Sequence, residues 1–348
     1  MSQERGGVDY TGQDGTLATL ASKYDYILTD VTISAVDEGT KSFTIGNSGY
    51  QYFSSKQSIA GFTFVNGTTP IKVSKLIISA ASGKLVQKVT IEKSFNNVYT
   101  YGGLVVTLPT PTSDMIYVAL NSRASPLDTY TFYVKDDTGN WWSGTAKAGL
   151  NVGKYYPANI KVTPYEIKGK INGHEWVRLK FGSTTKWATH NVDLTQSNFE
   201  TSDISNFGTA LAWGATSTTF GSGVTFPSSD ITATDKDVAW VKWGNGWKIP
   251  TSSEFDEIGS YSSSAGEYFW NGTTNGYYLS NVSDLGTGQI IFFPVQRTNA
   301  DATNYWSSSF RDTETNQAFC FWFRESSNRR YITGDYCTKK YYVRPVVK

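Results

Sequence analysis

Side chains that could act as metal ligands or nucleophiles are sparse in this chain. It has two histidines, His174 and His190, and two cysteines, Cys320 and Cys337. Neither histidine has a cysteine or a second histidine at the spacing of a metal-binding motif, and two thiols alone do not complete a structural zinc site. The sequence therefore predicts no metal centre at these residues.

Motifs of the common catalytic machineries are missing as well. The chain holds no Gly-x-Ser-x-Gly nucleophile motif, no glycine-rich phosphate loop and no His-Glu-x-x-His zinc motif. Two carboxylates could still meet in the fold, as in glycoside hydrolysis, but nothing in the sequence singles out a pair. We therefore expect a protein without enzymatic activity and keep a glycan-processing enzyme as the lesser alternative.

The composition is typical of an extracellular, β-rich protein. Of 348 residues, 18% are charged and 15% are aromatic, and the formal net charge is +1. Lysine and arginine are scattered, which argues against nucleic acid as a partner, because duplex binding needs a basic face. Abundant Gly, Ser, Thr, Asn and Tyr indicate short strands joined by long loops.

The sequence also bears on localisation. No stretch approaches the roughly 20 consecutive apolar residues that cross a bilayer, so no transmembrane segment is expected. The opening "MSQERGGVDYTGQDGT" lacks the apolar core of a signal peptide. We expect a protein exported to the cell surface, at the outer membrane or in a pilus, with its export signal absent from this sequence. Residues 1–18 are expected to be disordered.

Strand patterns fill the first half of the chain. In "TYTFYVKDDTGNWWSGTAKAGL", Tyr130, Phe132 and Val134 alternate with polar neighbours, and "DDTGN" supplies a turn before a second strand. "KLIISAASGKLVQKVTI" repeats the pattern, and "GLVVTLPTPTSDMIYVAL" predicts two strands around a Pro-Thr-Pro loop. Short strands at this spacing predict a β-sandwich over residues 19–165.

The composition of the sequence changes between Tyr165 and Gly173. Pro164 ends the last predicted strand of the first half, and tryptophan becomes frequent after this point. Residues 166–348 are therefore expected to form a second, α+β domain. Its end, "QAFCFWFRESSNRRYITGDYCTKKYYVRPVV", predicts antiparallel strands around a Ser-Ser-Asn turn. Both faces of "AFCFWFR" are apolar, which predicts a central strand. The chain as a whole is expected to be mainly β.

One helix is clearly signalled in the second domain, within "WKIPTSSEFDEIGSY". Thr251 is the expected N-cap and Glu254 its partner in a capping box, in which each side chain bonds the backbone amide of the other residue. Phe255 and Ile258 would form the apolar face of this helix, and Gly259 would end it.

Five motifs in order give the second domain a family resemblance. They are "NGHEWVRLKFGSTTKWATHNV", "FGTALAWGAT", "DVAWVKWGNGWKIPTSSEF", "NYWSSSF" and "YYVRPVV", and they run from Asn172 to Val347. The domain resembles the Fibrobacter-type major paralogous domain, a C-type-lectin-like module of Bacteroidetes surface proteins. We expect its signature residues to be structural; they are Trp187, Trp213, Trp243, Trp247, Pro250, Thr251, Glu254, Trp306, Arg344 and Pro345.

The first domain resembles the fimbrillin family of the same bacteria, through "KLIISAASGKLVQKVTI", "YTFYVKDDTGNWWSGTAKAGLNVGKYYPANIKV" and the order of its strands. That family is built of transthyretin-like β-sandwiches that assemble into pili by strand exchange, which implies other pilin subunits as partners. The chain stops at "VRPVVK" without a donor segment, as expected of a pilus (fimbrial) tip subunit. The resemblance implies an adhesin, and a purely structural cap without a ligand is the alternative.

Calcium-dependent sugar binding is the use expected of a C-type lectin. It requires Glu-Pro-Asn or Gln-Pro-Asp in the long loop and Trp-Asn-Asp on a nearby strand, because calcium takes about six to eight oxygen ligands. Here Trp306-Ser307-Ser308 stands where Trp-Asn-Asp would, and no Glu-Pro-Asn precedes it. The motif does not support calcium, and we expect no cofactor.

A calcium-free site for a glycan or protein, of host or bacterial origin, would combine aromatic stacking with amide and guanidinium groups. Trp270, flanked by glycine and asparagine residues, is the candidate best placed for exposure, whereas a central strand would bury Trp322. The candidates of these residue types are Trp270, Asn271, Tyr277, Asn304, Arg311, Trp322 and Arg324.

Two alternatives stay open for the cysteines. Cys320 and Cys337 could form a disulfide in an exported protein if their strands pair, or they could be independent buried thiols. His190 stands where many relatives of the lectin-like family have a cysteine. The bridge that the resemblance implies for Cys337 therefore lacks its partner here.

Overall fold

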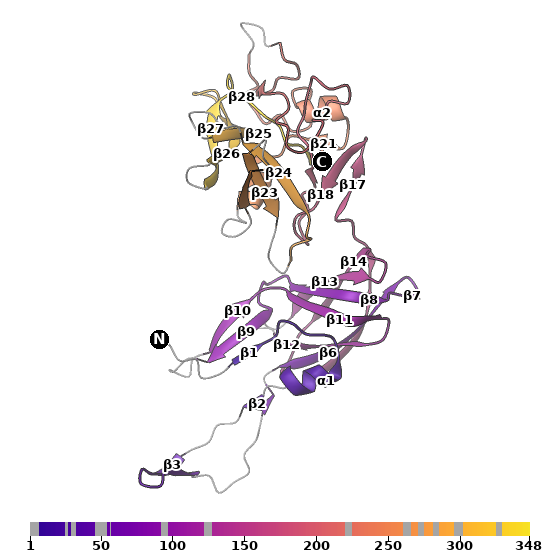
Figure 1. Ribbon diagram of the computed structural model, residues 1–348, viewed down its shortest axis with the longest axis vertical. Coiled ribbons are helices and arrows are strands. Elements are labelled where there is room, and N and C mark those ends of the chain that lie inside the picture. The colour runs from indigo at the N-terminus through magenta and orange to yellow at the C-terminus, as the bar shows by residue number, and fades with distance from the viewer. Residues whose placement is uncertain are drawn as a thin grey trace. The chain divides into compact units, whose positions relative to one another are not determined.

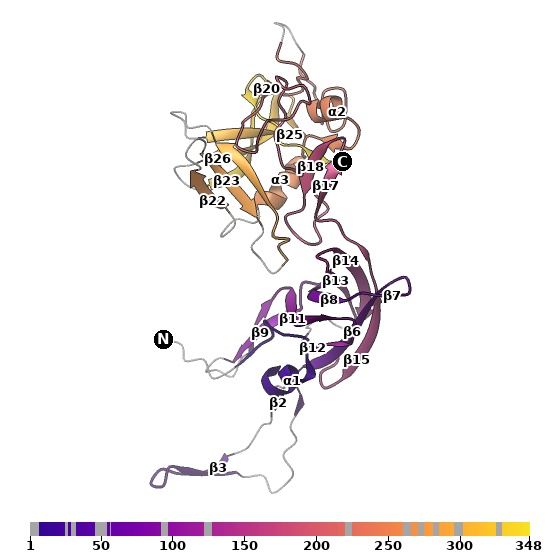
Figure 2. The ribbon, with the colours of Figure 1, turned by 45° about the vertical axis from the view of Figure 1, so that its right-hand side comes forward.

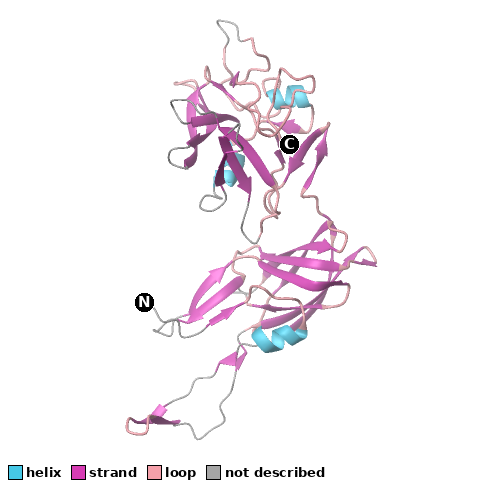
Figure 3. Ribbon diagram, viewed as in Figure 1, coloured by secondary structure: helices cyan, strands magenta, loops and turns pink. Residues whose placement is uncertain are grey.

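The computed structural model describes residues 7–24, 27–28, 33–45, 54–55, 57–91, 97–121, 127–219, 225–259, 266–270, 275–280, 285–295, 302–324 and 329–348. The chain divides into two compact units, Met1–Glu166 and Ile167–Lys348. Strands dominate both units, so the mainly β prediction is confirmed (Figure 3). Among the described residues, no helix has the length and apolar character needed to span a bilayer.

Two sheets form the body of the first unit (Figure 1). One has the strand order β11 (Leu104–Thr112), β8 (Val73–Ala80), β13 (Asp128–Asp136), β14 (Trp141–Ala148) and β16 (Thr163–Pro164). The other has the order β12 (Ile116–Leu120), β6 (Ser58–Asn66) and β15 (Tyr155–Lys161), and β7 (Thr69–Pro70) also pairs with β6. Among these pairs only β15 with β6 is parallel.

The apolar faces of these two sheets meet in a shared core. Phe62 of β6 and Phe132 of β13 lie edge to face with ring centroids 4.9 Å apart. Leu76 and Val134 are fully buried in the same core. Apolar residues at every second position therefore cover one side of each strand, which is the pattern that the sequence predicted for β13.

The turn between β13 and β14 is held by one carboxylate. Asp136 accepts hydrogen bonds from the backbone amides of Thr138 and Asn140 and from the Trp142 indole nitrogen at 2.9 Å. These bonds satisfy the amides of the tight turn and anchor one of the two adjacent tryptophans. The predicted hairpin around "DDTGN" is confirmed, with Lys135 opposite Trp141.

The predicted Pro-Thr-Pro loop is wrong, because β11 continues through Pro109 and Pro111 to Thr112. The register with β8 shifts between Thr107 and Thr112. Since β11 lies at the edge of its sheet, a proline there removes no hydrogen bond from a neighbouring strand on its outer side.

The structure describes the chain from Gly7, where a strand begins. The expected disorder over residues 1–18 is therefore wrong from Gly7 onward. Residues 1–6 lie outside the described part. Strand β1 (Gly7–Asp9) pairs with β9 (Val86–Ile91), which also pairs with β10 (Asn97–Tyr101). The short helix α1 (Leu17–Thr19) and the π-helical turn η1 (Leu20–Tyr24) follow.

A buried glutamine fixes this N-terminal segment. The Gln13 amide donates to the Ala119 carbonyl at 3.0 Å and accepts from the Ala119 amide at 2.7 Å. Tyr10 beside it is fully buried. The Gln13 side chain thus bonds both backbone groups of Ala119, as a neighbouring strand would, and this holds a polar segment in place. The amino-acid composition of the segment does not predict such a contact. Two further pairs complete the described strands of this unit: β2 (Ile27–Leu28) with β5 (Ser54–Ser55), and β3 (Ile33–Asp37) with β4 (Ser42–Ile45).

The second unit contains several small sheets (Figure 2). The first has the order β17 (Lys168–Ile171), β18 (His174–Val177), β19 (Trp187–Ala188), β29 (Val346–Val347) and β21 (Trp247–Lys248). The others are β22 (Gly266–Trp270) with β23 (Asn275–Ser280) and β24 (Ile290–Val295), β25 (Ala302–Asp312) with β26 (Gln317–Arg324) and β27 (Arg329–Tyr336), and β20 (Leu211–Ala212) with β28 (Lys340–Tyr341). As predicted, β26 is a central strand.

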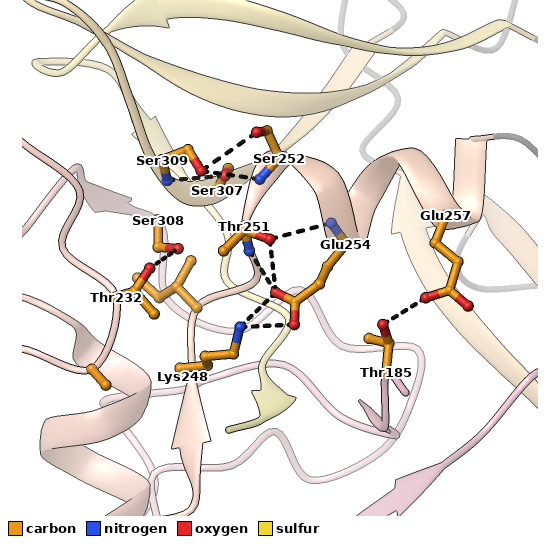
Figure 4. A network of polar contacts seen from close by, with 12 residues as sticks. Thr185, Thr232, Lys248, Thr251, Ser252, Glu254, Glu257, Ser307, Ser308 and Ser309 are labelled. Atoms are coloured by element: carbon orange, nitrogen blue, oxygen red, sulfur yellow. Dashed lines mark hydrogen bonds and ion pairs between the residues drawn. The ribbon is translucent and has the colours of Figure 1, made fainter. Parts of the chain in front are cut away.

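The predicted capping box is present at helix α3 (Ser252–Gly259), as Figure 4 shows. The Thr251 hydroxyl accepts from the Glu254 amide at 3.2 Å, and the Glu254 carboxylate accepts from the Thr251 amide at 2.7 Å. Both oxygens of Glu254 also lie 2.7 Å from the ammonium of Lys248. Phe255 and Ile258 are fully buried, as the apolar face predicted.

A second helix, α2 (Val238–Trp243), has a buried carboxylate at its N-terminus that the sequence did not single out. Asp237 accepts from the amides of Ala239 and Trp240 and, across the fold, from the amide of Ile249. The short helix and the segment that leads into α3 therefore share one anchor.

The signature residues of this unit line its interior. Trp187, Trp213, Trp247, Trp306 and Arg344 are among the largest fully buried side chains. The Arg344 guanidinium donates to the Asn191 side chain at 2.7 Å and to the Phe292 carbonyl at 2.6 Å, and it lies 5.0 Å from the ring centre of Phe293. Burial lowers the pKa of Arg344 to about 10, so the group keeps its charge at neutral pH.

Candidate binding face

Three residues on neighbouring strands form a row on one face of the sheet β25–β26–β27. Asn304 lies opposite Trp322, and Trp322 lies opposite Tyr331. Successive residues of a strand point to opposite faces, so this row shares its face with Trp306 and Cys320, which are buried further along the same strands. We call Asn304, Trp322 and Tyr331 the aromatic row.

The opposite face of this sheet is covered by α3. Phe255 of α3 stacks on Phe321 of β26 with ring centroids 4.8 Å apart and planes 10° apart. The face that carries the aromatic row is partly exposed at its outer end: Trp322 is half-buried, and Tyr331 is 41% exposed. The rings of these two residues pack together with centroids 4.3 Å apart.

Polar groups lie on the same face of the sheet, Asn304 opposite Trp322 and Asp335 further along β27. The Asn304 side-chain oxygen is buried, and no described residue donates a hydrogen bond to it. The Tyr341 hydroxyl bonds the Asp335 carboxylate, and its ring packs on Trp306 with centroids 4.6 Å apart. Burial, followed by the hydrogen bond to Asp335, raises the pKa of Tyr341, so this phenol stays protonated. Aromatic rings beside amide, phenol and carboxylate groups can stack on a sugar ring and bond its hydroxyls.

Of the residues expected to bind ligand whose side chains the structure describes, it brings together Asn304 and Trp322. Arg311 is exposed and bonds the Gln317 side chain at 3.1 Å. It packs against Gly334, which lies opposite Phe319 on the other face of the sheet from the aromatic row. Arg311 therefore does not join this face.

The other expected ligand residues are placed by their strands alone. Trp270 ends β22, Tyr277 lies in β23 and Arg324 ends β26 opposite Arg329. Asn271 and the Ser-Ser-Asn turn lie outside the described residues.

Sequence reasoning missed Tyr331, Asp335 and Tyr341. A signal for the first two was present, because Tyr331, Thr333 and Asp335 alternate along "RRYITGDY" and a strand there places them on one face. Tyr341 lies on another strand, β28, and only the tertiary fold brings it to Asp335.

A second polar cluster was also missed. His174 and His190 both contact the carboxylate of Glu200 through their Nδ1 atoms, the latter at 2.9 Å. The Thr189 hydroxyl lies 2.8 Å from the same His190 nitrogen. The ring of His174 stacks on Trp243, with centroids 3.9 Å apart and planes 5° apart.

The charge state of this cluster follows from its contacts. Burial by itself would raise the pKa of Glu200, but the hydrogen bonds from His174 and His190 outweigh it and lower the pKa to about 2. The cluster ties β18 to two loops through an ionised, mostly buried carboxylate. Within the described ranges, no group of three or more His, Cys, Asp or Glu residues is arranged to hold a metal ion.

Ser307, Ser308 and Ser309 of β25 bond within the fold. The Ser307 carbonyl accepts from the Trp213 indole at 2.8 Å. The Ser308 hydroxyl lies 2.7 Å from that of Thr232, and the Ser309 hydroxyl accepts from the Ser252 amide at 3.2 Å (Figure 4). Ser307 and Ser308 are fully buried, so this segment joins β25 to α3 and to the loop before α2.

The two cysteines are free and buried, which is the second of the two alternatives. Cys320 lies between Trp306 and Thr333 in the sheet, whereas Cys337 follows the end of β27. Burial raises the pKa of Cys320 to about 12 and that of Cys337 to about 11. Neither thiol is activated for nucleophilic chemistry.

Comparison with known proteins adds no assignment: no protein-family model matches the chain, and no curated protein matches it.

Proposed function

We propose that this protein is an exported, non-enzymatic adhesin of the cell surface, and that its second unit binds a glycan or a protein through the aromatic row. One observation carries the proposal. Trp322 and Tyr331 pack as a pair at a partly exposed end of a sheet face, and Asn304 lies opposite Trp322 in the same row. A ligand ring would pack on the exposed part of these two aromatic side chains.

Glycan is the ligand class that this combination favours. The C–H faces of a pyranose ring pack on aromatic rings, and its hydroxyls bond amide and carboxylate groups. Asn304 lies opposite Trp322, and Asp335 carries a carboxylate further along the same face, without a metal. We therefore expect binding that does not depend on calcium.

The finer architecture is part of the same proposal. The first unit would be a transthyretin-like sandwich of the fimbrillin type, and the second a C-type-lectin-like domain. Support for the first comes from two sheets that pack face to face around Phe62 and Phe132. Support for the second comes from β29, whose pairing with β19 joins the two ends of that unit. The role that follows is a pilus tip subunit, joined to other pilin subunits by strand exchange.

The test uses the full chain on an array of glycans and matrix proteins, with calcium and with chelator. The variants are Tyr331→Ala and Trp322→Ala. Tyr336→Ala is the matched control, because Tyr336 is a 52% exposed tyrosine of the same strand that points to the opposite face. We expect chelator-resistant binding that both row variants abolish and the control retains.

Other outcomes separate the alternatives. Binding lost in chelator would contradict a calcium-free site. Binding retained by Tyr331→Ala and Trp322→Ala would contradict the aromatic row, and no binding on the whole array would favour the structural cap. Cleavage of an arrayed glycan would favour the enzyme.

A further inference from the structure

A groove lies at the start of the second unit, away from the aromatic row. It has a volume of about 590 Å³, within the usual range for small-molecule sites. Its walls come from β17, β18 and the chain that enters β24. In Figures 1 and 2, β17 and β18 lie on the other side of this unit from β26. The residues whose side chains matter below are Lys168, Lys170, Glu175, Thr189, Gln289 and Ile290.

The strand pair that forms the groove wall is backed by an indole ring on its other face. The Trp176 ring lies over Gly169, where an added Cβ would come within 2.8 Å of a ring carbon. The ammonium of Lys186 lies 4.0 Å from the ring centre. Glycine thus lets the indole pack directly on the backbone of β17, on the opposite face of this strand pair from Lys168, Lys170 and Glu175.

The charges on the wall are unbalanced. Lys170 pairs with Glu175 at 3.0 Å, and both side chains are at least half exposed. Lys168, two residues earlier on the same strand, makes no ion pair with any residue that the structure describes. The wall therefore keeps one unpaired cation, and the attraction of an anion to it is opposed mainly by Glu175.

The remaining wall is suited to a ring with hydroxyl groups. Gln289 supplies an amide, and Ile290, which is 53% exposed, supplies an apolar surface, whereas the Thr189 hydroxyl already contacts His190. Amide and hydroxyl groups bond sugar hydroxyls, whereas an acidic peptide would need only the lysines.

We propose that this groove binds an acidic saccharide, in which a carboxylate or sulfate group bonds Lys168 and the sugar ring packs between Gln289 and Ile290. The site is separate from the aromatic row and does not depend on the function proposed for it. Lys168 is the residue that attracts the anion, and Glu175 lowers the affinity by occupying Lys170.

Calorimetric titration of the full chain tests the proposal. The probes are tetragalacturonate for carboxylate, a heparin tetrasaccharide for sulfate, maltotetraose as the neutral saccharide and tetraglutamate as the acidic peptide. The variants are Lys168→Ala and Glu175→Gln, both at exposed positions. Lys339→Ala, an exposed lysine after β27, is the matched control.

The two variants should act in opposite directions. Lys168→Ala should weaken binding of an acidic saccharide by about tenfold, the scale of one charge-assisted hydrogen bond. Glu175→Gln should strengthen it by about threefold, because it frees Lys170 and removes a repelling charge. Lys339→Ala should change nothing, and higher ionic strength should weaken binding to the wild-type protein.

Several results would overturn the proposal. An affinity unchanged by Lys168→Ala would remove the assigned cation, and a loss of affinity in Glu175→Gln would contradict the role of that carboxylate. Maltotetraose binding as tightly as the acidic saccharides would remove the charge requirement. Tetraglutamate binding equally well would indicate a peptide site. None of these results bears on Trp322 or Tyr331, so the two proposals stand or fall separately.

Discussion

Trp322 of β26 and Tyr331 of β27 lie directly opposite each other in the antiparallel register, with their ring centroids 4.3 Å apart. Asn304 of β25 completes the row from the other side. The pair lies at the end of a face whose inner part is filled by Trp306. The row is therefore both a cross-strand contact and a candidate ligand surface, and its two roles can be measured separately.

The packing of the pair should contribute little to stability. Truncating both rings in a double-mutant cycle of Trp322→Ala and Tyr331→Ala should give a coupling energy of about 0.5–1 kcal/mol, as for other aromatic cross-strand pairs. Urea unfolding followed by circular dichroism measures it. A coupling of several kcal/mol would mean that the rings belong to the core, and loss of ligand binding would then report unfolding.

Glu200 should make the second unit sensitive to acid. Its folded-state pKa is about 2, below the ordinary value of 4.5, so its bonds to His174 and His190 stabilise the fold fully above pH 4.5. That contribution, up to roughly 3 kcal/mol, is lost as the pH falls from 4.5 towards 2. Tryptophan fluorescence reports this unit selectively, because only Trp141 and Trp142 lie outside it.

The matched variant is Glu200→Gln. We expect it to be clearly less stable than wild type at pH 6, with a difference that shrinks below pH 4.5 and largely closes only as the pH falls to about 2. A difference that stays constant over this range would show that ionisation of Glu200 does not contribute.

Removing the Asp237 carboxylate should be costly. In Asp237→Ala the amides of Ala239, Trp240 and Ile249 lose their acceptor inside the protein. Each buried, unpaired amide costs about 1–3 kcal/mol, so a loss of about 3 kcal/mol or more is expected in urea unfolding. Asp235→Ala is the control, because Asp235 is exposed two residues earlier. Equal effects of the two variants would contradict the anchoring role.

The thiols should be inert in the folded protein. Burial raises the pKa of Cys320 to about 12 and that of Cys337 to about 11, so neither forms a thiolate at pH 8. Ellman's reagent should therefore find no reactive thiol in the native chain and two in guanidinium, without added reductant. If no thiol appears in guanidinium until a reductant is added, the two cysteines are bridged.

Local sequence determined the features whose partners are close along the chain. The capping box joins Thr251 to Glu254 within one helical turn, and "DDTGN" makes a turn because Asp136 reaches the amides that follow it. Alternation of apolar residues was enough to identify β13 and to make β26 central. These depend on backbone geometry and side-chain spacing, which a short stretch of residues specifies by itself.

Tertiary structure alone decided the features that join distant residues. The polar start of the chain is ordered because Gln13 bonds Ala119. His174 and His190, which had no metal-site spacing, converge instead on Glu200 from separate segments. The aromatic row exists because three strands pair in one register, and a shift of one residue would turn Trp322 to the other face. Sequence spacing specifies which way a side chain points along its own strand, but not which strand lies beside it.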